Sequence, residues 1–219
     1  MIGSTRRIRG RASAHRFGLM AAMAVVSWTL GCAGSGGPRS AAVVDVTEEG
    51  LRITESSALG LGTRSEFREA TLLLEGDDSA RAIERLEAVV EAEPELTAPR
   101  VNLAIALREA GRYEEAEATL LRAAELNPRH PVVQNELGIV HRRQGRFEEA
   151  RARYERALEI YGDFHFAQKN LGIVCELFLR DLDCAVESYR AYLDSVPGDE
   201  QVVMWVALLE QQMPAEVGK

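Results

Sequence analysis

From Thr63 onward, the apolar and polar positions of the chain follow a pattern that returns every 34 residues. Residues 111–116, GRYEEA, return as residues 145–150, GRFEEA. Proline stands near the end of three of the four periods, where it stops a helix because it cannot continue one. The pattern predicts consecutive pairs of amphipathic helices and therefore an all-α fold. Leucines recur at the same interval, at Leu103, Leu137 and Leu171.

A 34-residue period with small residues at fixed places resembles the tetratricopeptide repeat (TPR), a helix-turn-helix unit. The resemblance implies four repeats, at 63–96, 97–130, 131–164 and 165–199, stacked into a right-handed superhelical solenoid. The first repeat is degenerate and makes its turn with Asp77 and Asp78. The fourth has one extra residue around residues 179–183 and no glycine in its turn. A capping helix is expected at 200–213, followed by a disordered tail at 214–219.

Small residues mark the places where the two helices of each repeat must approach closely. The first helices carry them at Ala70, Ala104, Gly138 and Gly172, and the second helices at Ala82, Ala116, Ala150 and Ala185. Larger residues are expected to fill the space between the repeats, at Leu86, Leu120, Tyr154 and Tyr189.

The first 31 residues have the character of an export signal. They hold five arginines and no acidic residue, and the arginines are followed by an apolar stretch at 17–30, which is short for a bilayer span of about 20 residues. Leu30-Gly31-Cys32 then resembles the lipobox of bacterial lipoproteins, which implies lipidation at Cys32 and removal of residues 1–31. With Ala33 next, the resemblance implies an outer-membrane lipoprotein that faces the periplasm of a Gram-negative bacterium. An uncleaved signal anchor, or an ordinary signal cut near Ala33, is the alternative.

Residues 32–62 are polar and rich in glycine and serine, so we expect a flexible linker between the lipidated Cys32 and the repeats. Only Val43-Val44-Asp45-Val46 has the pattern of a short strand or a docking segment.

Charge and motifs exclude several function classes. A formal net charge of −8 argues against nucleic-acid binding, which needs a basic face. No nucleotide-binding, hydrolase or metalloprotease motif occurs, and His130, His141 and His165 have no ligand spacing, so we expect no enzyme, metal or cofactor. His141 is expected to be a packing residue on the inner face of a first helix.

The remaining two cysteines, Cys175 and Cys184, are an even pair in a chain expected to be exported, which favours a disulfide. The bridge would close a loop of about 10 residues across the irregular turn of the fourth repeat. Two buried reduced cysteines are the alternative.

The TPR resemblance implies a partner protein or peptide in the concave groove formed by the first helices. The clamp of the chaperone-binding subgroup does not match, because its opening Lys and Asn would fall on Val101 and Ile105. The basic residues among the groove positions could attract an acidic segment. The expected groove residues are Asn102, Ile105, Arg108, Asn135, Ile139, Arg142, Arg143, Phe166, Lys169, Asn170 and Ile173, with Phe67 and Val101 beside them.

These features favour a non-enzymatic scaffold that is tethered by lipid and helps to assemble or stabilise an envelope machine. The combination resembles small TPR lipoproteins that support pilus secretin assembly, and repeat proteins of energised transport or gliding motility. One alternative is a regulatory accessory subunit of a peptidoglycan or outer-membrane enzyme. A weaker alternative is an enzyme in its own right, with residues 39–62 completing its active site. The sequence does not determine the oligomeric state.

Overall fold

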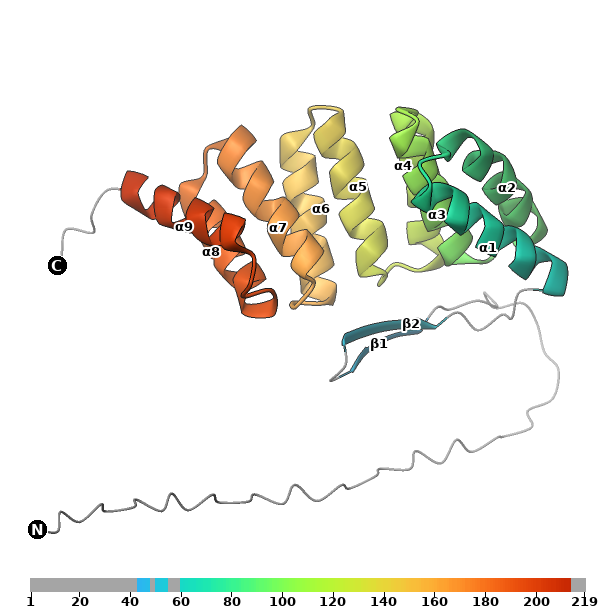
Figure 1. Ribbon diagram of the computed structural model, residues 1–219, viewed down its shortest axis with the longest axis horizontal. Coiled ribbons are helices and arrows are strands. Elements are labelled where there is room, and N and C mark those ends of the chain that lie inside the picture. Colours follow the sequence, from blue (N-terminus) through green and yellow to red (C-terminus); the bar gives the residue numbers. More distant parts are fainter. Residues whose placement is uncertain (1–42, 48–49, 55–59, 214–219) are drawn as a thin grey trace, which may run out of the picture. The chain divides into compact units, whose positions relative to one another are not determined.

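The structure, a computed structural model, describes residues 43–47, 50–54 and 60–213 (Figure 1). Helices make up the repeat region, and a short π-helical turn, η1 (Cys175–Leu179), follows α7. The helices are α1 (Leu61–Glu75), α2 (Ser79–Ala92), α3 (Thr97–Glu109), α4 (Tyr113–Leu126), α5 (Pro131–Arg143), α6 (Phe147–Ile160), α7 (His165–Val174), α8 (Leu182–Ser195) and α9 (Glu200–Gln212). None of the described helices combines the length and hydropathy needed to cross a bilayer.

The helices pack as consecutive antiparallel pairs, α1 with α2, α3 with α4, α5 with α6 and α7 with α8. The second helix of each pair also contacts the first helix of the next pair, and first helices contact one another from α1 to α3, α5 and α7. Residues 60–213 therefore form the all-α helical repeat that the 34-residue period predicts. Helix α1 begins at Leu61, two residues before the expected start of the first repeat, and Pro94, Pro128 and Pro197 lie in the short loops that follow α2, α4 and α8.

Each pair is held by a small residue of the first helix against a large residue of the second. A Cβ atom on Gly138 would come within 2.4 Å of the ring of Tyr154, and one on Gly172 within 2.4 Å of Tyr189. Both tyrosines are fully buried. The first two repeats have alanine and leucine at the same places, so a larger first-helix residue accompanies a smaller second-helix residue. The sizes of the two positions are thus matched within each repeat.

The turn inside each pair contains one residue with positive φ, at Asp77, Gly111, Gly145 and Arg180. Glycine adopts this conformation without steric cost, whereas other L-residues lose about 1–2 kcal/mol. In the two turns where this residue is not glycine, an aspartate follows it directly, and the aspartate carboxylate caps the next helix. Asp78 accepts from the Arg81 amide at 3.3 Å, and Asp181 accepts from the Cys184 amide at 3.1 Å. Such a cap contributes about 1 kcal/mol, which offsets much of the strain.

The extra residue of the fourth repeat is absorbed in η1, one turn earlier than the sequence analysis places it. There the helix widens, and the Asp181 amide donates to the Cys175 carbonyl at 3.0 Å. A widened turn takes up one added residue without breaking the helix. Arg180 then occupies the positive-φ position 35 residues after Gly145.

The linker expectation for residues 32–62 is wrong in part, because residues 43–47 and 50–54 form two paired β-strands and α1 begins at Leu61. Strand β1 (Val43–Thr47) pairs with β2 (Gly50–Thr54) in antiparallel register, with Val43 opposite Thr54. The flexible-linker expectation gave weight to glycine and serine, whereas the valines and Ile53 favour strands. The export signal, the lipidation site Cys32 and the tail at 214–219 lie outside the described residues.

The last helix, α9, covers α8 but does not end the array with a polar face. Val202, Val206 and Leu209 are buried in the cluster that α8 also lines. On the other side, Val203, Met204 and Leu208 are 47–60% exposed. A terminal cap ordinarily has a polar outer side. The expected capping helix therefore shields α8 while exposing an apolar face of its own.

Candidate partner-binding groove

The expected groove residues come from equivalent positions of three first helices, α3, α5 and α7. Arg143 and Phe166 are exposed, and Asn135 is buried. The other eight are half-buried: Asn102, Ile105, Arg108, Ile139, Arg142, Lys169, Asn170 and Ile173. The isoleucines stand 34 residues apart, so each helix presents the same partly open apolar position.

A chain of polar contacts links the three helices across this surface. The Asn170 amide donates to the side-chain oxygen of Asn135 at 3.0 Å, and the Asn135 amide contacts Glu136 at 3.4 Å. Arg108 Nε donates to the other carboxylate oxygen of Glu136 at 3.2 Å. The amide of Asn102 lies 3.5 Å from the hydroxyl of Thr71 on α1. The structure therefore brings Asn135, Asn170 and Arg108 together through contacts between neighbouring repeats.

Glu136 is a member of this network that the sequence analysis missed. Burial raises the pKa of its carboxyl group, and Arg108 opposes that shift. The signal was present in the period, because Glu136 stands 34 residues after Asn102 and 34 before Asn170.

Lys169 is one of the basic groove residues that could attract an acidic segment, but it already has an acidic partner within the chain. Its ammonium group binds Asp199 at 2.7 Å and lies 4.9 Å from the ring centre of Tyr192. The Tyr192 hydroxyl donates to the same carboxylate at 2.9 Å. The hydrogen bonds from Lys169 and Tyr192 lower the pKa of Asp199 to about 2. Lys169 is thus already neutralised by a carboxylate 30 residues away in sequence.

Arg142 and Arg143, at the end of α5, have no carboxylate partner among the described residues. Arg142 Nε is buried without a hydrogen-bond partner within the described part of the chain, and the same holds for the Tyr154 hydroxyl. Burial raises the pKa of Tyr154 to about 12, while the nearby Arg142 acts against this shift. Arg143 borders a cavity of about 440 Å³. The other lining residues are Asp77, Ser79, Arg108, Glu109 and Tyr113.

Phe166 gives the fourth repeat an open aromatic position. Its side chain is 58% exposed, and its ring lies 4.1 Å from that of His165 and 5.8 Å from that of Phe164. The two neighbouring rings hold it in place, so a partner can bury apolar area on it without first ordering a mobile side chain.

Two histidines make contacts that hold helices of the repeats. His130 caps α5 by accepting from the Val133 amide at 3.4 Å, and burial lowers its pKa to about 4. His141 lies 3.1 Å from Glu117 of α4, which also binds Arg146. His141 therefore faces the second helix of the preceding repeat and not the inner groove, a correction to the sequence analysis. No group of three potential metal ligands occurs within the described ranges.

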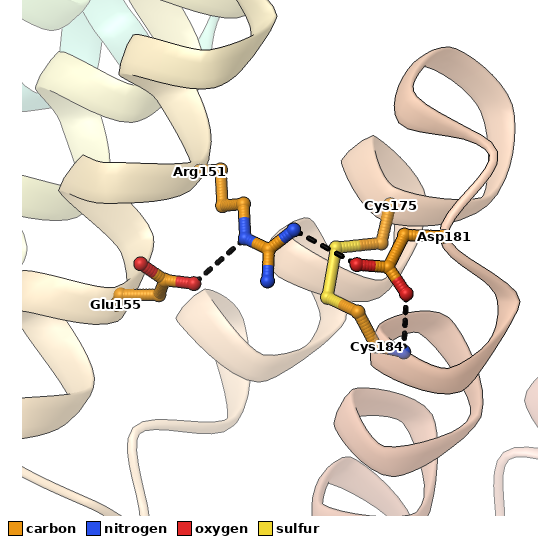
Figure 2. The surroundings of a disulfide bond; sticks show 5 residues. All are labelled: Arg151, Glu155, Cys175, Asp181 and Cys184. Carbon is orange, nitrogen blue, oxygen red and sulfur yellow. Dashed lines mark hydrogen bonds and ion pairs between the residues drawn. A yellow bond between two sulfur atoms is a disulfide. The ribbon is translucent and has the colours of Figure 1, made fainter.

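The disulfide Cys175–Cys184 joins η1 to α8 in the structure, as the pairing hypothesis expects. Figure 2 shows Arg151 of α6 beside it, between Glu155 and Asp181. Arg151 donates to Glu155 at 2.8 Å and to Asp181 at 2.9 Å. The backbone amide of Cys184 and the Arg151 guanidinium lower the pKa of Asp181. The irregular turn is therefore fixed by a covalent bond, a helix cap and an ion pair to the third repeat.

The arrangement of helix pairs is similar to that of known repeat proteins. The tetratricopeptide-repeat family model matches residues 95–163 and 129–196. Among solved structures, PilF of Pseudomonas aeruginosa is 21% identical, with a TM-score of 0.63 over 68% of each chain. MamA of Desulfovibrio magneticus RS-1 is 17% identical, with a TM-score of 0.61 over 71% of this chain and 87% of that one.

YrrB, described as a TPR protein with an unusual peptide-binding site, is 17% identical, with a TM-score of 0.53 over 67% of this chain and 75% of that one. At these identities the likeness concerns the fold. No curated protein matches the sequence.

Proposed function

We propose that this protein is a non-enzymatic scaffold that holds a protein or peptide partner along α3, α5 and α7, since the tetratricopeptide-repeat family model matches residues 95–163 and 129–196. One observation carries the proposal. The first helices combine a row of partly open isoleucines, an exposed and preordered Phe166, and two cations without carboxylate partners among the described residues. Apolar positions beside a few convergent polar groups are what a peptide-binding surface requires.

We further propose that the scaffold is attached to the cell envelope by lipid on Cys32 and faces the periplasm. The lipobox-like Leu30-Gly31-Cys32 after an apolar stretch supports this place. The Cys175–Cys184 bond agrees with it, because disulfides persist in oxidising compartments. In this role the protein assembles or stabilises an envelope machine, such as a pilus, motility or energised transport system.

The decisive experiment is affinity capture after mild crosslinking in native cells, with the intact mass of the bait recorded. Arg142→Glu together with Phe166→Ala should abolish capture of the partner, because the two changes remove a groove cation and the open aromatic surface. The matched control is Arg156→Glu, which reverses an exposed charge on the second helix α6. Loss of capture in the control as well, or retention in the groove variant, would contradict the groove.

The mass of the same bait tests the anchor. Loss of residues 1–31 with added acyl mass on Cys32 is expected. An unprocessed chain, or exclusively cytoplasmic partners, would overturn the envelope assignment. Captured peptidoglycan or outer-membrane enzymes, in place of machine components, would favour the regulatory-subunit alternative.

A further inference from the structure

Internal comparison of the repeats shows that one ion pair of the groove lacks its acidic member. Position 102 of the second repeat is equivalent to 136 and 170, and position 108 is equivalent to 142. Arg108 binds Glu136, which stands 28 residues later on the next first helix. Arg142 stands 28 residues before Asn170, which is neutral. The third repeat thus has the same cation, Arg142, but the position that holds the carboxylate of Glu136 for Arg108 holds the amide of Asn170 for Arg142.

The surrounding residues do not supply the missing charge. Of the four expected groove cations, Arg108 is paired with Glu136 and Lys169 with Asp199. Arg142 and its neighbour Arg143 have no carboxylate partner in the described part of the chain. Arg142 is half-buried, so a group that arrives from solvent can reach it.

One buried polar atom of Arg142 is left unpaired. Arg142 Nε is buried and has no hydrogen-bond partner among the described residues. The guanidinium group lies near the buried Tyr154 hydroxyl and opposes the rise in the tyrosine pKa, so it already interacts with that phenol. Buried polar groups are nearly always paired, so the unpaired Nε requires an explanation. A carboxylate bound to the guanidinium group would supply the missing acceptor.

We propose that Arg142 is the anchor for a carboxylate of the bound partner, which takes the place that Glu136 holds opposite Arg108. This inference rests on the proposed groove and names the chemistry of its ligand. Guanidinium groups bind carboxylates through two parallel hydrogen bonds, which gives direction as well as charge. Asn170, at the position equivalent to Glu136, is neutral and donates its amide to Asn135. The ligand group is a side-chain carboxylate or a C-terminal one.

The test uses labelled peptides of about eight residues, which span roughly 25 Å when extended. The first alternates Ala and Glu with both ends capped, the second alternates Ala and Gln with a free C-terminal carboxylate, and the third is the Ala-Gln peptide with both ends capped. Fluorescence anisotropy with the purified folded protein should show binding of the first or the second peptide about tenfold tighter than of the third. Preference for the first indicates a side-chain carboxylate, and preference for the second a C-terminal one. Equal binding of all three peptides, or none of any, overturns the inference.

Two groove substitutions and one control substitution locate the effect. Arg142→Gln should remove the preference for carboxylate, while Arg156→Gln on α6 should leave it unchanged. Asn170→Glu places an internal carboxylate opposite Arg142, so it should weaken carboxylate binding about tenfold and also raise the unfolding temperature. The rise in stability shows that the variant has folded. Unchanged binding in both groove variants would overturn the inference. If the Arg142→Gln variant still captures a partner in cells, the anchor is overturned and the scaffold function stays intact.

Discussion

At the scale of single residues, the period predicts which positions are small, but not how tightly each is packed. Gly138 and Gly172 are expected at a close approach, and the structure places a tyrosine ring against both. The sequence could not assign a partner to Lys169, because Asp199 lies in the next repeat and becomes a neighbour only after folding. The 34-residue period aligns Glu136 with Asn102 and Asn170, but an acidic residue at that position is expected to be solvated, so its place in the network becomes clear only once its burial is known.

Gly138→Ala tests the size match between the helices of a repeat. The added methyl group overlaps the ring of Tyr154, so we expect a loss of about 1–3 kcal/mol in the free energy of unfolding. Adding Tyr154→Leu recreates the Ala104–Leu120 combination of the second repeat and should recover part of the loss. Urea unfolding of the two single variants and the double variant measures the coupling. Gly162→Ala, where a Cβ meets nothing closer than 4.0 Å, is the control. Additive effects would contradict a direct clash.

His130 makes the repeat array sensitive to acid. Burial lowers its pKa from 6.5 to about 4, so the folded protein holds the imidazole neutral while the unfolded chain protonates it. The stabilisation is therefore complete above about pH 6.5 and is lost as the pH falls toward 4, by an amount on the order of 2–3 kcal/mol. His130→Asn keeps a capping side chain and should flatten this part of the pH profile of unfolding. His165→Asn should not, and an unchanged slope in His130→Asn would refute the assignment.

At the scale of elements, proline and glycine mark the ends of the helix pairs already in the sequence. The conformation of the irregular turn in the fourth repeat, by contrast, cannot be predicted until the fold is known. The extra residue is visible in the period, yet its place is not, because the widened turn η1 forms where Cys175 is tied to Cys184. The hairpin of β1 and β2 is likewise underestimated, since two five-residue strands give a weak signal beside glycine-rich neighbours.

Reduction of the Cys175–Cys184 bond should destabilise the fourth repeat selectively. The bond closes a short loop, and its loss costs about 2–3 kcal/mol in the chain-entropy model. Hydrogen exchange with and without reductant should show faster exchange in α7, η1 and α8, with α1 to α4 little changed. The Cys175→Ala/Cys184→Ser variant should behave like the reduced protein under both conditions. A uniform change over all helices would contradict a local role.

At the scale of the whole molecule, each repeat contacts only its neighbours, so stability is distributed along the array. The central helices α5 and α6 have a packed helix pair on both sides, whereas α1 and α9 each lack one among the described residues. The fold was predictable because a 34-residue period leaves few alternatives. The partner was not, because the groove chemistry depends on which cations the neighbouring repeats neutralise.

The expected outcome is a gradient of hydrogen-exchange protection along the array. Protection should be greatest in α5 and α6 and least in α1 and α9, where opening breaks a single interface. Native-state exchange at low denaturant concentration measures the gradient. Equal opening free energies for all helices would mean that the array unfolds only as one unit.

The exposed face of α9 also has a consequence for protein engineering. Ala207 stands 35 residues after Gly172 and is exposed, with Val203, Met204 and Leu208 beside it. Helix α9 therefore has the face of a first helix, like that of α7, but no second helix among the described residues packs on it in the way that α8 packs on α7. A grafted helix with the sequence pattern of α8, fused behind a short turn, would find its packing surface already present, so this end of the array is a natural point for lengthening it by design.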